Sequence, residues 1–337
     1  MAVADLTLII YNMPLLNVGT LIKKLRMQQG MTQEDLAYPI VEQSTLSRIE
    51  NGQTMPNKST TEMLLERLGY NPGNIDIIID KKTADIQKTM DELYELISIE
   101  SIHDDQAERT KKADEIITML EGDEEFMAER VNRQYILLNK AMCALHRKDE
   151  SGSSAVLDML MEAMKISIPE YNEKDIDKYY LSKQDVRIIN LTTMVYRDSG
   201  RVDDGINVLN LLKKNFEETN IDKESKGEYY ARVVYALAQL LDYAKRYKEA
   251  LAMCDRAAEV CRETGVFRLL PLITAYKAQN LYNVGEEDEC LELVIPECIE
   301  LVNQAFYASK MFGFQNWVNM VKDFAKNNLN FELSPPN

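Results

Sequence analysis

Apolar residues return at helical spacing along most of this chain of 337 residues. From about residue 83 onward they recur every three or four positions, with few prolines and almost no alternating strand pattern. Short polar turns interrupt the pattern at intervals and divide it into successive helices. The pattern therefore predicts an all-α protein with a long helical array over residues 83–330.

The array has an internal repeat. In each unit a helix ends in a short polar turn, and the second helix has a small residue early and an apolar residue four positions later. The clearest copy contains Leu237, Leu241, Ala250, Cys254 and Ala257. Other copies cover residues 278–294, 196–212, 142–159 and 93–117. We predict five helix pairs and a capping helix around residues 305–328 that holds Trp317; a generic helical bundle is the alternative.

A different pattern occupies residues 17–70 and predicts a compact unit of short helices. Thr32 is a good helix N-cap, and the apolar stripe that follows it ends near Pro39, which leaves the end of that helix open. The next helix opens near Gln43 or Ser44 and buries Leu46 and Ile49. Asn51-Gly52 stops it, and Pro56 prevents it from resuming. Two short helices that meet at a sharp turn are typical of a DNA-reading unit.

The outer faces of this second helix carry short polar groups and one guanidinium, which suit base edges and phosphates. These candidate DNA contacts are Gln43, Ser44, Thr45, Ser47 and Arg48. The alternative is a capped surface helix with a glycine stop. Any one of these residues means little alone, but their joint spacing favours a DNA-binding module.

The order of residues in this unit resembles the Xre type of helix-turn-helix domain. The resemblance implies a partly buried ion pair between Arg26 and Glu50, and phosphate-side roles for Gln33 and Asn51; Thr32, beside Gln33, joins the candidate DNA contacts. The turn is one residue shorter than in the commonest phage repressors, with Val41-Glu42 in place of a glycine-containing turn. That spacing is similar to the PlcR-like peptide-sensing regulators.

The N-terminal unit and the rest of the chain differ in net charge. Residues 17–70 hold six basic and six acidic residues, so the rest of the chain carries the whole formal charge of −16. An acidic body is repelled by a polyanion, so the N-terminal unit is the only plausible DNA contact, and its non-specific binding is expected to be weak and salt-sensitive.

The array resembles the tetratricopeptide repeat, whose usual period is about 34 residues, with longer helices as in peptide-sensing regulators. Stacked pairs form a superhelix whose concave face, lined by the first helix of each pair, binds extended peptides. Amides there hold a peptide backbone, and arginine takes a carboxylate bidentately. The predicted inward positions are Lys140, Arg147, Arg187, Asn190, Arg197, Arg232, Tyr235, Gln239, Gln279 and Tyr282. For each residue alone, a solvated face or an internal ion pair is the alternative.

The segments outside these two units have simpler interpretations. Residues 1–16 form an apolar leader without early Lys or Arg, unlike a secretory signal; it either packs on the protein, is disordered, or docks in the protein's own groove through residues 5–12, and Met13 is a second candidate start. Residues 71–82 form a linker. No segment approaches the ~20 apolar residues that span a bilayer. Five cysteines without Cys-x-x-Cys spacing indicate reduced core thiols in a cytoplasmic protein.

Catalytic chemistry is not expected. His103 and His146 are the only histidines, and a Cys143–His146 pair on one helix seldom aligns for proton transfer. There is no phosphate-cradling glycine loop and no metal-ligand spacing, so we expect neither an enzyme nor a cofactor.

The two-part layout resembles the RRNPP family of quorum-sensing regulators from Gram-positive bacteria. The resemblance implies a homodimeric transcription regulator that binds double-stranded operator DNA and a short, re-imported signalling peptide. Two alternatives remain: a Rap-type array that grips a partner protein, and a phage or plasmid repressor without a peptide ligand. The intact Gln33, Ser47 and Arg48 argue against a vestigial head.

Overall fold

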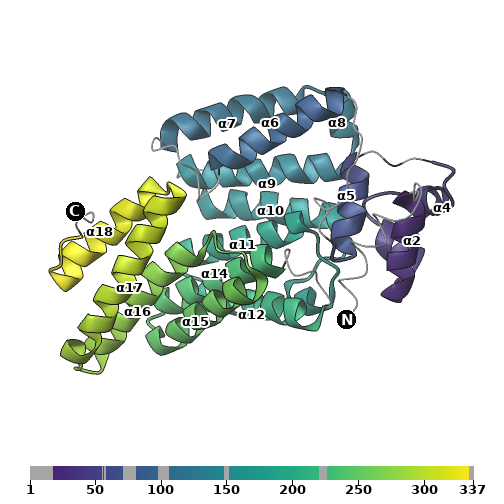
Figure 1. Cartoon of the computed structure of the whole chain (residues 1–337). Helices are drawn as coiled ribbons and strands as arrows, with labels where there is room; N and C mark the ends of the chain where they lie inside the picture. Colours follow the sequence, from purple (N-terminus) through teal and green to yellow (C-terminus); the bar gives the residue numbers. More distant parts are fainter. Residues whose placement is uncertain are drawn as a thin grey trace.

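The computed structural model describes residues 18–54, 56, 58–70, 81–97, 106–147, 152–219 and 226–333. Every regular element in these ranges is a helix, which confirms the predicted fold class. The predictions for residues 1–16, for residues 71–80 of the linker and for His103 fall outside the described residues. Figure 1 shows a small N-terminal unit, called the head here (residues 18–70), at the side of a long array, called the body (residues 81–333).

The head consists of α2 (Val18–Gln28), α3 (Gln33–Ala37), α4 (Gln43–Glu50) and α5 (Lys58–Arg67). One apolar core joins them, in which Ile22, Leu36, Leu46 and Leu64 are fully buried. Since each helix is too short to be stable alone, this shared core supplies most of their stability.

The caps of the head helices agree with the sequence. Thr32 caps α3 through its side chain, which accepts a hydrogen bond from the Asp35 amide, and the Asp35 carboxylate accepts one from the Thr32 amide. Helix α3, whose end the sequence left open, ends at Ala37. Pro39 keeps Tyr38 in extended conformation (ψ 132°). At the end of α4, Gly52 adopts φ 71°, the left-handed region that glycine enters without a steric penalty.

The body has the five predicted helix pairs within its described residues, followed by one last helix. The pairs are α6 (Lys81–Ile97) with α7 (Gln106–Glu121), α9 (Arg130–Arg147) with α10 (Gly152–Ser167), α11 (Lys183–Asp198) with α12 (Val202–Glu218), α14 (Ala231–Tyr243) with α15 (Tyr247–Thr264), and α16 (Leu270–Glu287) with α17 (Leu291–Phe312). The last helix is α18 (Gln315–Leu329), and the short connecting elements are α8 (Glu124–Ala128), η2 (Glu173–Lys178) and η3 (Lys226–Tyr230). Figure 1 shows the pairs stacked in chain order from α6 and α7 to α18.

The predicted capping helix over residues 305–328 is wrong in its bounds. Helix α17 continues to Phe312, Gly313 ends it with φ 77°, and Trp317 belongs to the separate helix α18. The Trp317 ring packs on Phe314, with ring centroids 4.3 Å apart. A left-handed glycine between two apolar helical stretches divides them without disturbing the periodicity that the prediction followed.

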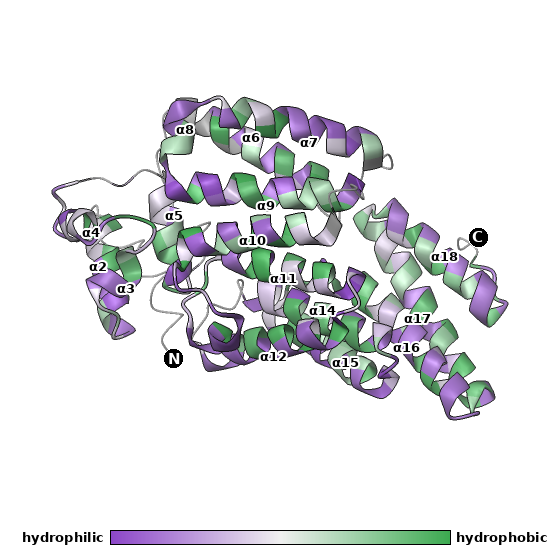
Figure 2. Cartoon of the chain, turned by 180° about the vertical axis from the view of Figure 1, so that it is seen from behind, coloured by the Kyte–Doolittle hydropathy of each residue, from purple (hydrophilic) through white to green (hydrophobic). Residues whose placement is uncertain are grey.

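Small residues allow the paired helices to approach closely, as predicted. Ala250, Cys254 and Ala257 of α15 are fully buried in the main core. Within the fifth pair, a Cβ on Gly285 would lie 2.4 Å from Val294 Cγ2; between the third and fourth pairs, one on Gly205 would lie 2.8 Å from Leu240 Cδ1. Apolar segments alternate with polar ones along the body helices in Figure 2, as expected for helices that each bury one stripe.

The cysteines are free thiols within this helical packing. Cys143, Cys254, Cys261 and Cys298 are buried, and Cys290 is partly exposed. Burial raises the pKa of the Cys143 thiol to about 12, so it is not a thiolate nucleophile at neutral pH. None of the described helices is long and apolar enough to cross a membrane.

Candidate DNA-binding head and peptide groove

Helix α4 presents the predicted DNA contacts on its outer side. Leu46 and Ile49 are buried against the head core, whereas Gln43, Ser44 and Arg48 are exposed. Thr45 and Ser47 are half-buried, and Arg48 Nη2 donates to Thr45 Oγ1 at 3.3 Å. An exposed row of hydroxyl, amide and guanidinium groups on a rigid helix has the chemistry that reads the major groove.

A buried ion pair ties α4 to α2. Arg26 donates through Nε to Glu50 Oε1 at 2.6 Å and through Nη2 to Glu50 Oε2 at 2.9 Å, and Arg26 Nη1 donates to the Met31 carbonyl. Burial acts to raise the pKa of Glu50, but hydrogen bonds from Arg26 and Gln33 outweigh it and hold the pKa below its ordinary value. The ion pair implied by the family resemblance is therefore confirmed.

Two of the proposed phosphate-side residues have internal partners that the sequence did not reveal. Gln33 Nε2 donates to Glu50 Oε2 at 2.8 Å, and Gln43 Nε2 lies 3.5 Å from Gln33 Oε1. Lys23 Nζ donates to Asn51 Oδ1 at 3.3 Å. Gln33 thus links the buried ion pair to the first residue of α4, and half-buried Lys23 adds a cation beside Asn51.

The head rests on the body through contacts between distant parts of the chain. Arg130 of α9 pairs with Glu42 at 3.1 Å and lies 5.5 Å above the Tyr38 ring. Glu66 of α5 lies 3.7 Å from Lys183 Nζ of α11, and Val131 of α9 packs into the head core. Both cartoon views place α5 beside the ends of α9 and α10. A crevice beside this joint is lined by Gln43 from the head and by Ile168 and Tyr180 from the body, among others.

The predicted groove residues of α11 form one stripe. Arg187, Asn190 and Arg197 are spaced by three and seven positions, which places them on one helix face, and Lys183, which was not predicted, lies four positions before Arg187 on the same face. The Arg187 guanidinium lies 5.0 Å from the ring of Tyr94 on α6. Among the described residues, the buried Asn190 Oδ1 has no hydrogen-bond partner.

A recess of about 220 Å³ lies beside Tyr94, the ring that the Arg187 guanidinium contacts. Its lining comes from Tyr94 of α6, from Gly227, Glu228 and Arg232 at the start of the fourth pair, and from Val266, Arg268 and Leu269 before α16. The structure therefore gathers Arg187 and Arg232 around Tyr94, with contributions from first helices of several pairs. We call this region the groove.

The other predicted peptide contacts lie elsewhere or have internal contacts. Lys140 pairs with Glu121 at 2.5 Å and Arg147 pairs with Asp114, both in a recess among α7, α9 and α10 that the structure does not join to the groove. Arg197 pairs with its neighbour Asp198 at 2.8 Å.

Towards the C-terminus, the predicted groove residues make hydrogen bonds and ring contacts with other residues of the protein. Tyr235 is buried, its ring meets that of Tyr276 edge to face, and its hydroxyl accepts from Gln239 at 3.2 Å. Gln279 lies 3.4 Å from Asp242, which also accepts from Tyr276. Tyr282 is buried against Phe324. These residues join α14, α16 and α18 to one another.

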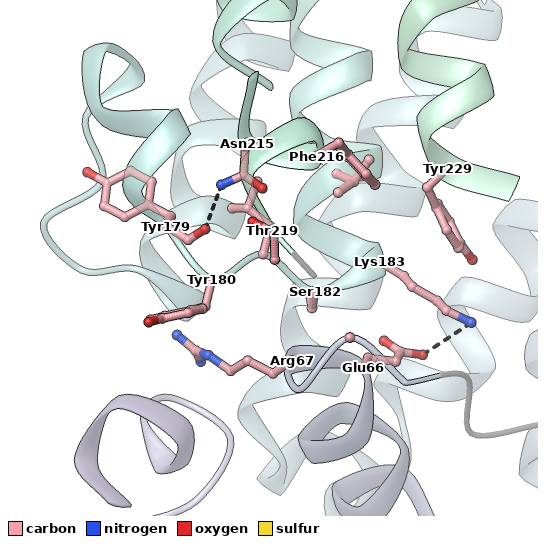
Figure 3. A pocket seen from close by; sticks show the side chains of 13 residues that line it. Glu66, Arg67, Tyr179, Tyr180, Ser182, Lys183, Asn215, Phe216, Thr219 and Tyr229 are labelled. Atoms are coloured by element: carbon pink, nitrogen blue, oxygen red, sulfur yellow. Dashed lines mark hydrogen bonds and ion pairs between the residues drawn. The ribbon is translucent and has the colours of Figure 1, made fainter. Parts of the chain in front are cut away.

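Several groove residues escaped the sequence reasoning. Lys183 lies one turn before Arg187 on the same face of α11, so helical spacing alone was enough to find it. Tyr94, Tyr229 and Arg268 reach the same region from three other segments, and no periodicity links them. Figure 3 shows Lys183 and Tyr229 near Glu66 of the head.

Comparison with known proteins supports this division of the chain. Residues 22–74 match the helix-turn-helix family HTH_3. These residues are a DNA-binding helix-turn-helix domain. The match coincides with the head helices, whose buried Arg26–Glu50 pair and exposed α4 were described above. No curated protein sequence matches the chain.

Solved structures match almost the whole chain at low identity. PlcR of Bacillus thuringiensis in complex with the peptide PapR7 and DNA is 18% identical, with a TM-score of 0.57 over 90% of this chain and 98% of that one. Its apo form is 17% identical, with a TM-score of 0.52 over 90% and 97%. ComR of Streptococcus vestibularis with its cognate signaling peptide XIP is 14% identical, with a TM-score of 0.50 over 92% and 98%. The predicted likeness to the RRNPP regulators is confirmed at the level of fold: a helix-turn-helix domain followed by a PlcR-like helical repeat domain.

Proposed function

We propose that this protein is a transcription regulator that binds operator DNA through its helix-turn-helix domain and a short signalling peptide in the groove of its body. The observation that carries the proposal is the α11 stripe of Arg187 and Asn190, from which Arg187 contacts Tyr94 in the wall of a recess, in a chain that also has a DNA-reading head. The shared fold with peptide-bound PlcR and ComR supports the same assignment.

On the DNA side, α4 enters the major groove with its exposed residues towards the bases. Arg48 is the strongest candidate, since a guanidinium binds guanine or phosphate bidentately. Two heads of a homodimer read half-sites about 34 Å apart, or multiples of that distance, so a small change in their relative placement alters the fit to an operator. Peptide and DNA then change each other's affinity by equal factors.

On the peptide side, Asn190 supplies the most specific contact. Its Oδ1 is buried without a partner among the described residues, and leaving a buried polar atom unsatisfied costs about 1–3 kcal/mol. A peptide backbone amide that donates to this oxygen removes that penalty. Arg187, three positions before it on α11, adds positive charge on the same helix face.

Arg48→Ala is expected to weaken operator binding by about 1–3 kcal/mol, or roughly 5- to 150-fold, because it removes one base or phosphate contact. The measurement is fluorescence anisotropy with DNA from the region upstream of the gene, at fixed salt. Arg262→Ala, which removes an exposed arginine from α15, is the matched control and should bind like the wild type. Unchanged operator affinity of Arg48→Ala would mean that α4 is not part of the DNA interface.

Asn190→Ala is expected to abolish or strongly reduce the response to peptide while leaving peptide-free DNA binding intact. The assay adds synthetic peptides from small reading frames next to the gene to the same anisotropy measurement. Asn303→Ala, at a half-buried asparagine of α17, is the control. DNA binding that ignores every peptide would favour a plain repressor, and absence of DNA binding would favour an array that grips a partner protein.

A further inference from the structure

Two arginines of the body lie beside the start of the recognition helix. Arg130 Nη2 pairs with Glu42 Oε1 at 3.1 Å, and Glu42 is the N-cap residue of α4. Arg133 follows Arg130 by three positions on α9, which places both side chains on the same side of that helix. Both cartoon views place the start of α9 on the side of the body that faces the head. Cations of the body therefore lie next to the end of the DNA-reading helix.

The Arg130 guanidinium has N–H groups to spare. The side chain is 39% exposed, and among the described residues it donates only from Nη2, to Glu42. The ring of Tyr38, whose centroid is 5.5 Å away, supports it from the head. Since a guanidinium carries five N–H groups in a fixed fork, the others can bind a second anion while Glu42 stays bound. Arg133 is exposed, and no described residue contacts its side chain through an ion pair or a hydrogen bond.

The place of this pair agrees with the path of the DNA backbone on a helix-turn-helix domain. The recognition helix enters the major groove with its N-terminal residues at the base edges, so the phosphates that border the groove pass near that end of the helix. Glu42 makes no side-chain hydrogen bond to the start of α4, which leaves the amides of the first turn to attract a phosphate. A phosphate at this end of α4 lies within reach of an arginine that contacts Glu42.

Positive charge at this place is informative because its surroundings are acidic. The chain has a formal charge of −16, and Glu34 and Asp35 of α3 line the crevice at the joint. The Asp35 carboxylate is engaged in the cap of α3, and Glu42 is paired with Arg130. A cation here lowers the repulsion between an acidic protein and the DNA polyanion.

We propose that Arg130 and Arg133 bind backbone phosphates next to the recognition helix, so that the body takes part in DNA binding. Arg130 bridges Glu42 and one phosphate through different N–H groups, and Arg133 binds a neighbouring phosphate. Contacts of this kind fix the position of a protein on the duplex and carry no sequence information. The DNA-binding surface then extends from the head onto the start of α9. This inference uses the helix-turn-helix domain and does not depend on a peptide ligand.

The test measures the affinity of the full-length protein for DNA by fluorescence anisotropy at salt concentrations from about 50 to 200 mM. One probe is DNA from the region upstream of the gene, and the other is a random-sequence duplex of the same length, because phosphate contacts act on both. The variants are Arg130→Gln, Arg133→Gln and Glu42→Gln. Arg246→Gln, in an exposed ion pair with Glu249 at the start of α15, is the matched control.

The expected result is a weaker dependence of affinity on salt. Each phosphate contact contributes about −0.9 to the slope of log affinity against log salt, so Arg130→Gln and Arg133→Gln should each make the slope less steep by about 0.9. At about 0.1 M salt the same contact corresponds to a roughly eightfold loss of affinity, equal for the two probes. Arg246→Gln should keep the slope and the affinity of the wild type.

Glu42→Gln separates a phosphate contact from a purely structural ion pair. A phosphate-binding Arg130 predicts that Glu42→Gln binds DNA at least as tightly as the wild type, because the change removes a negative charge beside the phosphate. If Arg130 only held the head on the body, Glu42→Gln and Arg130→Gln would weaken DNA binding alike without a change of slope, and this result would overturn the inference.

The inference stays testable if Arg130→Gln is poorly folded. Arg133→Gln then decides, since its side chain loses no ion pair or hydrogen bond with a described residue, and an unchanged slope in this variant overturns the inference. Absence of wild-type binding to both probes would overturn DNA binding by the head, and the inference with it.

Discussion

Arg26→Met is expected to destabilise the head by about 3–5 kcal/mol, because removing one partner of a buried ion pair leaves the other charge uncompensated. The Glu50 side chain is fully buried and that of Arg26 is 11% exposed, so water cannot replace the lost bonds. Since Glu50 lies at the end of α4, operator binding should fall with head stability. Hydrogen exchange of the α2–α5 amides in the full-length protein measures the local loss of protection.

The pH dependence separates a charge effect from simple loss of packing. In the wild type the pKa of Glu50 is held below its usual 4.5, so the pair stabilises the head fully above about pH 4.5 and less as the pH falls through the lowered value. In Arg26→Met, burial without the main partner raises the pKa of Glu50, so the loss of stability is largest near pH 7 and shrinks towards pH 4.

The double variant R26M/E50Q should recover most of the loss of stability. Arg246→Met, which breaks an exposed pair with Glu249, should have little effect. A deficit of equal size at pH 4 and pH 7 would contradict the ionic explanation.

Gly19→Ala is the second change with a large expected effect. A Cβ at this position of α2 would lie 1.7 Å from the Ile49 carbonyl oxygen and 2.6 Å from its carbon, both in the backbone of α4. No rotamer change relieves a backbone clash, so α2 and α4 must separate. Overpacking of this kind costs about 1–3 kcal/mol and occasionally more. Because α4 carries the proposed DNA contacts, we expect the free energy of operator binding to change by more than the free energy of unfolding of the head.

Anisotropy with operator DNA and hydrogen exchange of α2 and α4 measure the two effects of Gly19→Ala separately. Gly122→Ala is the matched control, since the nearest atom to its added Cβ is 3.4 Å away and its φ is not left-handed. Normal operator binding by Gly19→Ala would show that α2 and α4 separate without disturbing the recognition surface.

The joint between head and body lies next to the first residues of the recognition helix α4. Gln43, a candidate DNA contact, also lines the crevice against the body, and Glu42 beside it pairs with Arg130. The start of α4 therefore lies close to basic and aromatic groups of the body. Any movement of the head on the body changes the surroundings of this end of the recognition helix, which is how a ligand in the groove would reach the DNA-binding surface.

Local sequence determined the helices of the head and the small-residue packing of the array. The Thr32 cap, the left-handed Gly52 and the buried Leu46 and Ile49 each depend on groups within four residues, so spacing predicted them directly. The Arg26–Glu50 pair followed from the family resemblance. Local reasoning was wrong where one left-handed residue, Gly313, divided a continuous apolar pattern and placed Trp317 in a separate helix.

Tertiary structure alone decided which predicted contacts share a surface. The rotation between successive helix pairs brings Arg187 and Arg232 to the groove with Tyr94, while Lys140 lies in another recess against α7. The joint of Glu66 with Lys183 connects residues more than a hundred positions apart. Helical periodicity and caps are set by interactions within one turn, so the sequence determines them by itself. Groove and joint depend on the sum of small rotations along the array, which no local pattern contains.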